Sequence, residues 1–304
     1  MTVINTNTAA TISANALTKN ERAMSQTMER LSTGQRINSA ADDAAGLAIS
    51  SKMTSQINGL NQAVRNANDG ISMVQTAEGA LIEIDNMLQR MRELGVQAAS
   101  DTNTTSDRTA LNAEFEALRA EITRIAVNTQ FNGAAVFGQA ADSTKAFQVG
   151  ANASQTISVT FGNFNAGVEA GGAGLAGNTA STASSKFLVL DEDGSTGSTT
   201  DDIVDQDLLS ASNAKDAIYI MDSAIAAVAT ERASYGAAIS RLEYAADNLA
   251  NVSQNASASR SRILDADYAA ETTELARTQI IQQAGTAMLS QANQQAQSVL
   301  ALLK

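Results

Sequence analysis

The sequence predicts a mainly α-helical protein: an elongated antiparallel helical bundle or coiled-coil rod with a small β-hairpin insert. None of the 304 residues is proline, so the strongest helix breaker is absent. Aromatic residues make up 4% of the chain, without tryptophan, and the apolar content is mostly Ala, Leu, Ile, Val and Met, which suit helix seams. Apolar residues also recur in alternating steps of three and four through five segments, a period near 3.5 that indicates left-handed coiled-coil packing.

The first two helices are predicted in the N-terminal third. The seam of the first helix is Ala10, Ala14, Leu17, Glu21, Met24, Met28 and Leu31. The second helix should begin near Asp42 and Asp43, whose carboxylates suit a helix N-terminus, and end near Ser100. Such a helix is about 84 Å long at 1.5 Å per residue, too long for a compact domain. Its seam runs through Met53, Ile57, Leu60, Val64, Ala67, Ile71 and Val74 and continues through Ala77, Leu81, Ile84, Leu88 and Met91. Its five glycines indicate close helix packing: Gly46, Gly59, Gly70, Gly79 and Gly95.

Three further helices complete the predicted bundle. The third has its seam at Leu111, Phe115, Leu118, Ile122 and Ile125, with Gly133 as its expected stop. The fourth runs from Ala214 to Leu249. The fifth has its strongest seam residues at Leu264, Tyr268, Leu275, Leu289, Ala292, Ala296, Val299 and Leu303, with Glu271, Thr278, Gln282 and Gly285 keeping step.

A different composition marks residues 134–210, which are rich in Gly, Ser, Thr and Asn. Short alternating runs at 146–149, 156–161 and 186–190 predict strands or hairpins there. The acidic stretch 191–207 is interpreted as a solvated loop. Because this insert lies at the midpoint of the sequence, the chain should run out along the rod and return, which places the two termini together at one end.

Both ends of the chain lack charge. Residues 1–18 and 278–303 carry no charged side chain, although both show helical apolar spacing. A soluble helix normally has a charged outer face, so these faces should be buried against other copies of the chain. Head-to-tail contacts between copies that do not close into a ring generate a helical filament. The alternative is that both ends fold back onto the middle of their own chain.

Composition excludes several classes of function. With no Cys and no His, disulfides, ordinary zinc sites and thiol or imidazole catalysis are excluded, which removes most enzyme mechanisms. Ser, Lys, Asp and Glu remain, so catalysis is disfavoured without being forbidden, and we expect no enzyme activity, no metal and no cofactor. A net charge of −12 argues against nucleic acid and anionic membranes as partners. The chain shows neither a signal-peptide pattern nor an apolar run of 18 residues.

Two ligand-binding interpretations arise in the insert. Gly172, Gly174 and Gly177 match the spacing of a dinucleotide fingerprint that ends at Asp191. Only nine residues separate the last glycine from the next strand, too few for the required helix. Asp191, Asp193, Ser195 and Asp202 partly fit a calcium loop, but its glycine is one step late, at Gly197. Neither pattern therefore meets the requirements of the site that it resembles.

Seven motifs resemble those of bacterial flagellin. They are LSTGQRIN at 31–38, INSAADDAAGLAI at 37–49, QRMRELGVQ at 89–97, QFNG at 130–133, QVG at 148–150, SRSRILDADYA at 259–269 and QANQQAQSVLALL at 291–303. The resemblance covers roughly residues 1–150 and 210–304. It implies a structural subunit that self-assembles into the flagellar filament for motility, with a small central variable region. The hook-filament junction protein, a relative with similar terminal helices, is the alternative.

The resemblance also implies a domain organisation and partners. Residues 1–43 and 258–304 would form a terminal coiled-coil domain in the filament core, and residues 44–257 would form the outer helical bundle with the β insert at about 134–210. Family members leave the cell through the flagellar type III apparatus, which implies a secreted, extracellular chain. Its partners would be further copies of itself, the hook-filament junction protein, and the filament cap protein and export chaperone at the C-terminal segment.

Two sets of site residues follow. The resemblance implies recognition by Toll-like receptor 5 of a host through Arg90, Leu94 and Glu114, a surface that would also make axial contacts between subunits. The resemblance leads us to expect Ala at position 95, where this chain has Gly. The assembly seam of the terminal helices is predicted at Leu17, Met24, Met28, Leu31, Leu264, Leu275, Leu289, Val299 and Leu303.

Overall fold

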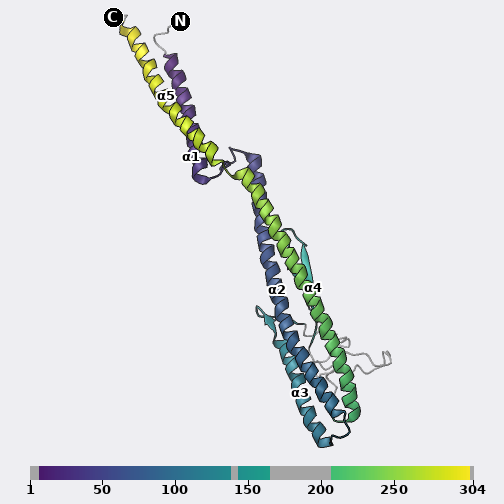
Figure 1. The fold of residues 1–304 in the computed structure, drawn as a ribbon. Coiled ribbons are helices and arrows are strands. Elements are labelled where there is room, and N and C mark those ends of the chain that lie inside the picture. Colours follow the sequence, from purple (N-terminus) through teal and green to yellow (C-terminus); the bar gives the residue numbers. More distant parts are fainter. Residues whose placement is uncertain (1–6, 138–142, 165–206, 302–304) are drawn as a thin grey trace, which may run out of the picture. The chain divides into compact units, whose positions relative to one another are not determined.

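The computed structural model describes residues 7–137, 143–164 and 207–301 and confirms the mainly α-helical fold (Figure 1). Its elements are α1 (Thr8–Thr33), α2 (Ala44–Ala98), α3 (Thr105–Asn128), β1 (Gln130–Phe131), β2 (Ala134–Ala135), β3 (Ser143–Gln148), β4 (Thr156–Phe161), α4 (Ala211–Leu264) and α5 (Tyr268–Ala301). The predicted strand at 186–190 lies outside the described residues.

Side-chain caps explain where several helices begin. Asn7 Oδ1 accepts from the Ala10 amide at 3.0 Å, and Asp43 Oδ1 accepts from the Gly46 amide at 2.9 Å. Thr104 and Asp107 form a reciprocal capping box at the start of α3. At the other end of α1, Gly34 closes the helix in the left-handed region with φ 71°. The N-terminus of α2 predicted near Asp42 and Asp43 is confirmed.

The boundary between α4 and α5 differs from the prediction. The apolar pattern placed Leu264 in the fifth helix, whereas the structure ends α4 at Leu264 and begins α5 at Tyr268. Asp267 Oδ1 accepts from the Ala269 and Ala270 amides, at 2.9 and 3.3 Å, and so caps the new helix. Apolar spacing continues across this break, so periodicity alone could not reveal it.

The chain divides into two compact units. Unit 1 comprises Met1–Asn58 and Val252–Lys304, and unit 2 comprises Gly59–Asn251. The division falls inside α2 and α4, whereas the family resemblance suggested limits near residues 43 and 258. The functional limits of the inner and outer domains remain a prediction.

Unit 2 contains the main hydrophobic core. In this unit α2, α3 and α4 run side by side (Figure 1), and their facing side chains are fully buried. The predicted track of α2 is confirmed: Ala77, Leu81, Ile84, Leu88 and Met91 each have 0% exposure. Phe115 and Ile122 of α3 and Tyr235 of α4 complete the centre of this core.

Two antiparallel hairpins belong to unit 2. Strands β1 and β2 are joined through Asn132 and Gly133, whose φ values of 50° and 77° fit a tight two-residue turn. Strands β3 and β4 pair from Ser143–Phe161 to Gln148–Thr156, within the region where strands were predicted. Phe161 is fully buried, with its ring 5.4 Å from that of Tyr235, and so anchors the second hairpin on α4.

Four of the five glycines of α2 lie where another chain segment comes close. A Cβ at Gly70 would stand 3.1 Å from the Phe147 ring, and one at Gly95 would stand 3.1 Å from Ile218 Cγ1 of α4. Gly46 and Gly59 are similarly crowded, by Asp43 and by Ala151. Close packing therefore explains Gly95 in place of Ala. The prediction was wrong at Gly79, where a Cβ would meet nothing within 4 Å.

Replacing Gly79 with Ala is expected to stabilise unit 2. The new methyl group meets no neighbour, and Ala is favoured over Gly inside a helix by about 1 kcal/mol. Urea unfolding should therefore give a free energy of unfolding higher by about that amount. Gly70→Ala is the matched control, because its methyl group would press on Phe147 and cancel the gain. If Gly79→Ala and Gly70→Ala changed the free energy of unfolding equally, this description of the packing around the two glycines would be wrong.

Candidate interaction surfaces

Within unit 1, α1 and α5 form an antiparallel pair, so the start of α1 lies beside the end of α5 (Figure 1). Asn7 Nδ2 donates to the carbonyl of Ala292 at 3.1 Å, and Asn20 Nδ2 donates to the carbonyl of Thr278 at 2.8 Å. Between these two bonds, Leu17 packs so closely on α5 that a Cβ at Gly285 would stand 2.8 Å from its Cδ1. The terminal helices α1 and α5 are therefore paired, as the sequence predicts.

The predicted seam residues take different positions. Those that lie half-buried in the α1–α5 pair are Leu17, Met24, Leu31, Leu275 and Leu289. Met28 is 53% exposed and lies outside the seam. Leu264 belongs to α4 and its carbonyl accepts from the Arg36 amide at 2.6 Å. Val299 lies in α5 but its side chain is outside the described residues, as is the whole of Leu303.

Polar residues occupy the most buried positions of this seam. Asn20 is 9% exposed, Thr27 5% and Thr278 2%. Each has hydrogen bonds: the hydroxyls of Thr27 and Thr278 donate to carbonyls of their own helices, and Asn20 reaches across to α5. The three- and four-residue steps of the predicted seam run through Ala14, Glu21 and Met28, and so pass by Asn20 and Thr27. The seven-residue spacing between the polar residues Asn20 and Thr27 was the signal that could have placed them in the seam.

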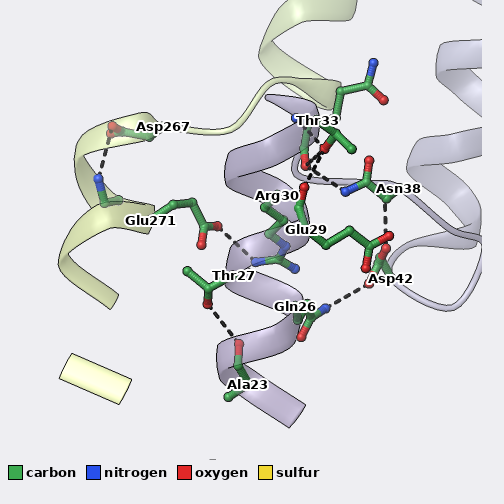
Figure 2. A network of polar contacts seen from close by, with 12 residues as sticks. Ala23, Gln26, Thr27, Glu29, Arg30, Thr33, Asn38, Asp42, Asp267 and Glu271 are labelled. Carbon is green, nitrogen blue, oxygen red and sulfur yellow. Dashed lines mark hydrogen bonds and ion pairs between the residues drawn. The ribbon is translucent and has the colours of Figure 1, made fainter. Parts of the chain in front are cut away.

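An ion pair and a short backbone bridge join the end of α1 to the region where α5 begins. Arg30 Nη1 lies 3.1 Å from Glu271 Oε1, and the Glu271 side chain is only 13% exposed (Figure 2). Arg30 lies in the last turn of α1 and Glu271 in the first turn of α5, where the helix dipoles favour these charges. Gln35 and Asp265 form an antiparallel β-bridge next to this pair.

Asp42 holds the connection between α1 and α2 against α1. Its carboxylate accepts from the amides of Asn38 and Ser39, at 3.2 and 2.9 Å, and from Gln26 Nε2 of α1 at 2.8 Å (Figure 2). These bonds, chiefly that from the Ser39 amide, lower the pKa of Asp42 below its ordinary value of 3.8. The stabilisation they give is thus present at neutral pH and is lost only as the pH falls through that lowered pKa.

Unit 1 has almost no apolar core of its own. Among the described residues, only two of its apolar side chains are buried, Ile37 and Ile57. In contrast, it holds eight of the thirteen large apolar side chains that are exposed: Ile12, Met28, Ile49, Val252, Tyr268, Ile280, Ile281 and Met288. A small apolar core together with this many exposed apolar side chains makes unit 1 a candidate for contacts with partners.

Charge is divided unequally between the units. Unit 1 carries nine basic and eight acidic residues, a net charge of +1. Unit 2 carries eleven basic and twenty-four acidic residues, a net charge of −13, which together give the −12 of the whole chain. Copies of unit 1 can therefore pack together with little net repulsion, whereas copies of unit 2 repel one another.

The predicted recognition residues lie on α2 and α3 of unit 2. Arg90 donates through Nη2 to Glu114 Oε1 at 2.8 Å and through Nη1 to Glu93 Oε2 at 3.0 Å. The side chains of Arg90 and Glu114 are 49% and 46% exposed, so both can contact a partner. Leu94 differs: it is fully buried in the core of unit 2, because its helical position faces inward with Leu88 and Met91.

The described residues offer no group of three or more acidic side chains that could hold a metal ion. None of the described helices has a stretch apolar enough, over sufficient length, to cross a bilayer. The glycines of the dinucleotide-like spacing and the calcium-like aspartates lie outside the described residues.

Two family models match the chain. Residues 4–142 match the bacterial flagellin N-terminal helical region, and residues 218–303 match the bacterial flagellin C-terminal helical region. The matched segments contain α1 to α3, most of α4 and all of α5, including the α1–α5 pair and the three predicted recognition residues.

Full-length relatives agree with these matches. A flagellin of Halalkalibacterium halodurans is 44% identical over 277 residues, which cover 91% of this chain and 90% of the relative. Flagellin B of Vibrio cholerae is 35% identical over 372 aligned residues, covering 99% of both chains. A crystal structure of Bacillus cereus flagellin aligns with 61% of this chain and 88% of its own at 26% identity, with a TM-score of 0.44.

Proposed function

The chain belongs to the bacterial flagellin family and is a structural subunit of a flagellar filament; from this premise we propose that unit 1 supplies the contacts that hold the subunits together. The observation that carries the proposal is that, among the described residues, unit 1 buries two apolar side chains and exposes eight large ones. A helix pair of this kind gains stability when neighbouring copies cover its outer faces.

In the proposed filament, residues 1–43 and 258–304, which make up most of unit 1, form the inner coiled-coil domain. Residues 44–257, which include all of unit 2, form the outer domain. The charge distribution supports this order, because the nearly neutral unit 1 can be packed densely, whereas the net charge of −13 on unit 2 is best tolerated next to solvent.

The export route and the assembly partners are part of the same proposal. The subunit leaves the cell through the flagellar type III apparatus and is assembled extracellularly, in contact with the hook-filament junction protein at the filament base. The cap protein and the export chaperone bind the C-terminal segment. Exposed Ile280, Ile281 and Met288 on α5 support this, because they offer an apolar helix face to a partner.

Electron microscopy of the purified chain tests the filament assignment. After addition of salt, which screens the repulsion between copies of unit 2, we expect long helical filaments. Short assemblies that never elongate would contradict the assignment and would favour the related hook-filament junction protein instead. A chain that stays monomeric at all protein and salt concentrations would overturn assembly through unit 1.

We also propose that Toll-like receptor 5 recognises unit 2 through Arg90 and Glu114. Half-exposed charged side chains with fixed geometry are suited to charge-assisted hydrogen bonds with a partner. Arg90→Ala and Glu114→Ala are each expected to reduce activation of a receptor reporter cell line by about tenfold to a hundredfold, since a lost charged hydrogen bond costs about 1.5–3 kcal/mol.

Arg124→Ala is the matched control for this prediction. Arg124 is also an exposed arginine paired with a glutamate, Glu121, but it lies about three turns further along α3 than Glu114. It should leave receptor activation unchanged. The proposal is wrong if all three variants activate the receptor as the unmodified chain does.

A further inference from the structure

The seam of α1 has two flanks, which differ in how far they are buried. Ala10, Leu17, Met24 and Leu31 form a spine at seven-residue intervals. On one side of the spine lie the polar residues Ser13, Asn20 and Thr27, which are half-buried or buried, and Asn20 donates a hydrogen bond to α5. On the other side lie Ala14, Glu21 and Met28, here named the Met28 flank, and all three are exposed.

Asn20 fixes which flank faces α5. Its Nδ2 group donates to the Thr278 carbonyl at 2.8 Å in a site where both residues are at least nine-tenths buried. If α1 rotated to bring the Met28 flank onto α5, this bond would break and the carboxylate of Glu21 would be buried without a partner. A buried Asn is known to fix the pairing of helices in coiled coils. The Met28 flank therefore stays directed away from α5.

The Met28 flank has the character of a second seam. Met28 is 53% exposed although it continues the apolar spacing of the spine, and the spine residues themselves are only half-buried by α5. Glu21 makes no ion pair within the described part of the chain. A second helix on this side would cover the rest of the spine, as in coiled coils of more than two strands.

A second copy of the chain is the occupant that the charges favour. Because unit 1 has a net charge of only +1, another unit 1 can approach this flank without strong repulsion, whereas unit 2, at −13, would be repelled by Glu21. Unit 1 also carries exposed basic side chains, such as Lys19 and Arg22, that could pair with Glu21.

We infer that the Met28 flank of α1 docks on unit 1 of a second copy of this chain, with Met28 buried at the contact and Glu21 paired with a basic side chain of that copy. This inference rests on the proposed assembly through unit 1 and names the surface involved. The two flanks then make different contacts. The flank with Asn20 binds α5 of the same chain, and the flank with Met28 binds unit 1 of another copy.

Met28→Glu tests the inference. The critical concentration for polymerisation, measured by sedimentation, should rise about tenfold or more, because a methionine buried at the proposed contact is replaced by a charge. Met28→Leu should polymerise nearly normally, since it keeps the apolar volume. Ile82→Glu, at an exposed apolar position of unit 2, controls for the added negative charge and should have little effect. Polymerisation of Met28→Glu at the unmodified critical concentration would overturn the inference.

An engineered disulfide separates this contact from the α1–α5 pair. The chain has no Cys, so Leu17→Cys with Gly285→Cys introduces a single possible bond where the two helices touch. The bond should form equally well with and without Met28→Glu. If Met28→Glu prevents it, Met28 acts through the α1–α5 pair and the inference is wrong. If the unmodified chain itself fails to polymerise, the proposed function fails instead.

Discussion

A chain that lacks residues 278–304 is expected to lose polymerisation completely while unit 2 stays folded. The deletion removes Thr278 and Gly285, which contact Asn20 and Leu17 in the α1–α5 pair. Only the first ten residues of α5 then remain beside the end of α1, and the rest of α1 loses its intrachain partner. Sedimentation and electron microscopy should find no filaments at concentrations at which the full chain polymerises.

Two controls make the result of the deletion specific. Urea unfolding followed by circular dichroism should show that the main transition of unit 2 is unchanged, because its core lies within residues 59–251. A second variant keeps the length and composition of residues 278–304 but shuffles their order, which destroys the three- and four-residue steps. It should fail as the deletion does. Normal filaments from either variant would show that α5 is not needed for assembly.

Periodicity predicted the helices because they bury apolar side chains. The steps from Ala77 to Met91 on α2 coincide with fully buried positions, and the chain contains no proline to interrupt them. The break at 265–267 escaped prediction because it depends on Asp267 as a cap and on backbone bonds to residues 34–36, which leave the apolar spacing unchanged.

The interaction surfaces were less predictable, since their decisive residues are polar. Asn20 and Thr27 fill seam positions because nearby carbonyls accept their hydrogen bonds, and a pattern of apolar residues cannot show where such carbonyls lie. The sequence pattern also could not show which apolar side chains are exposed. Met28 and Leu94 both belong to helical apolar patterns, yet Met28 is 53% exposed and Leu94 is fully buried.

Leu94→Ala is expected to lower the free energy of unfolding of unit 2 by about 2–5 kcal/mol. The side chain is fully buried in the core, so its truncation removes buried apolar surface and leaves a cavity. Arg90→Ala, one turn away on the exposed face of α2, should change the same free energy by about 0.5 kcal/mol or less. Urea unfolding of the two variants beside the unmodified chain measures both effects.

This difference decides how receptor assays on the two variants are interpreted. Because Arg90 is half-exposed, a loss of activation in Arg90→Ala reports a lost contact. Because Leu94 is covered, a loss in Leu94→Ala should follow from a displaced or partly unfolded α2 and should be accompanied by earlier unfolding. If Leu94→Ala remains as stable as the unmodified chain and still fails to activate the receptor, Leu94 makes a direct contact. Recognition would then require α2 to open, and the receptor would bind a conformation in which this part of the core is exposed.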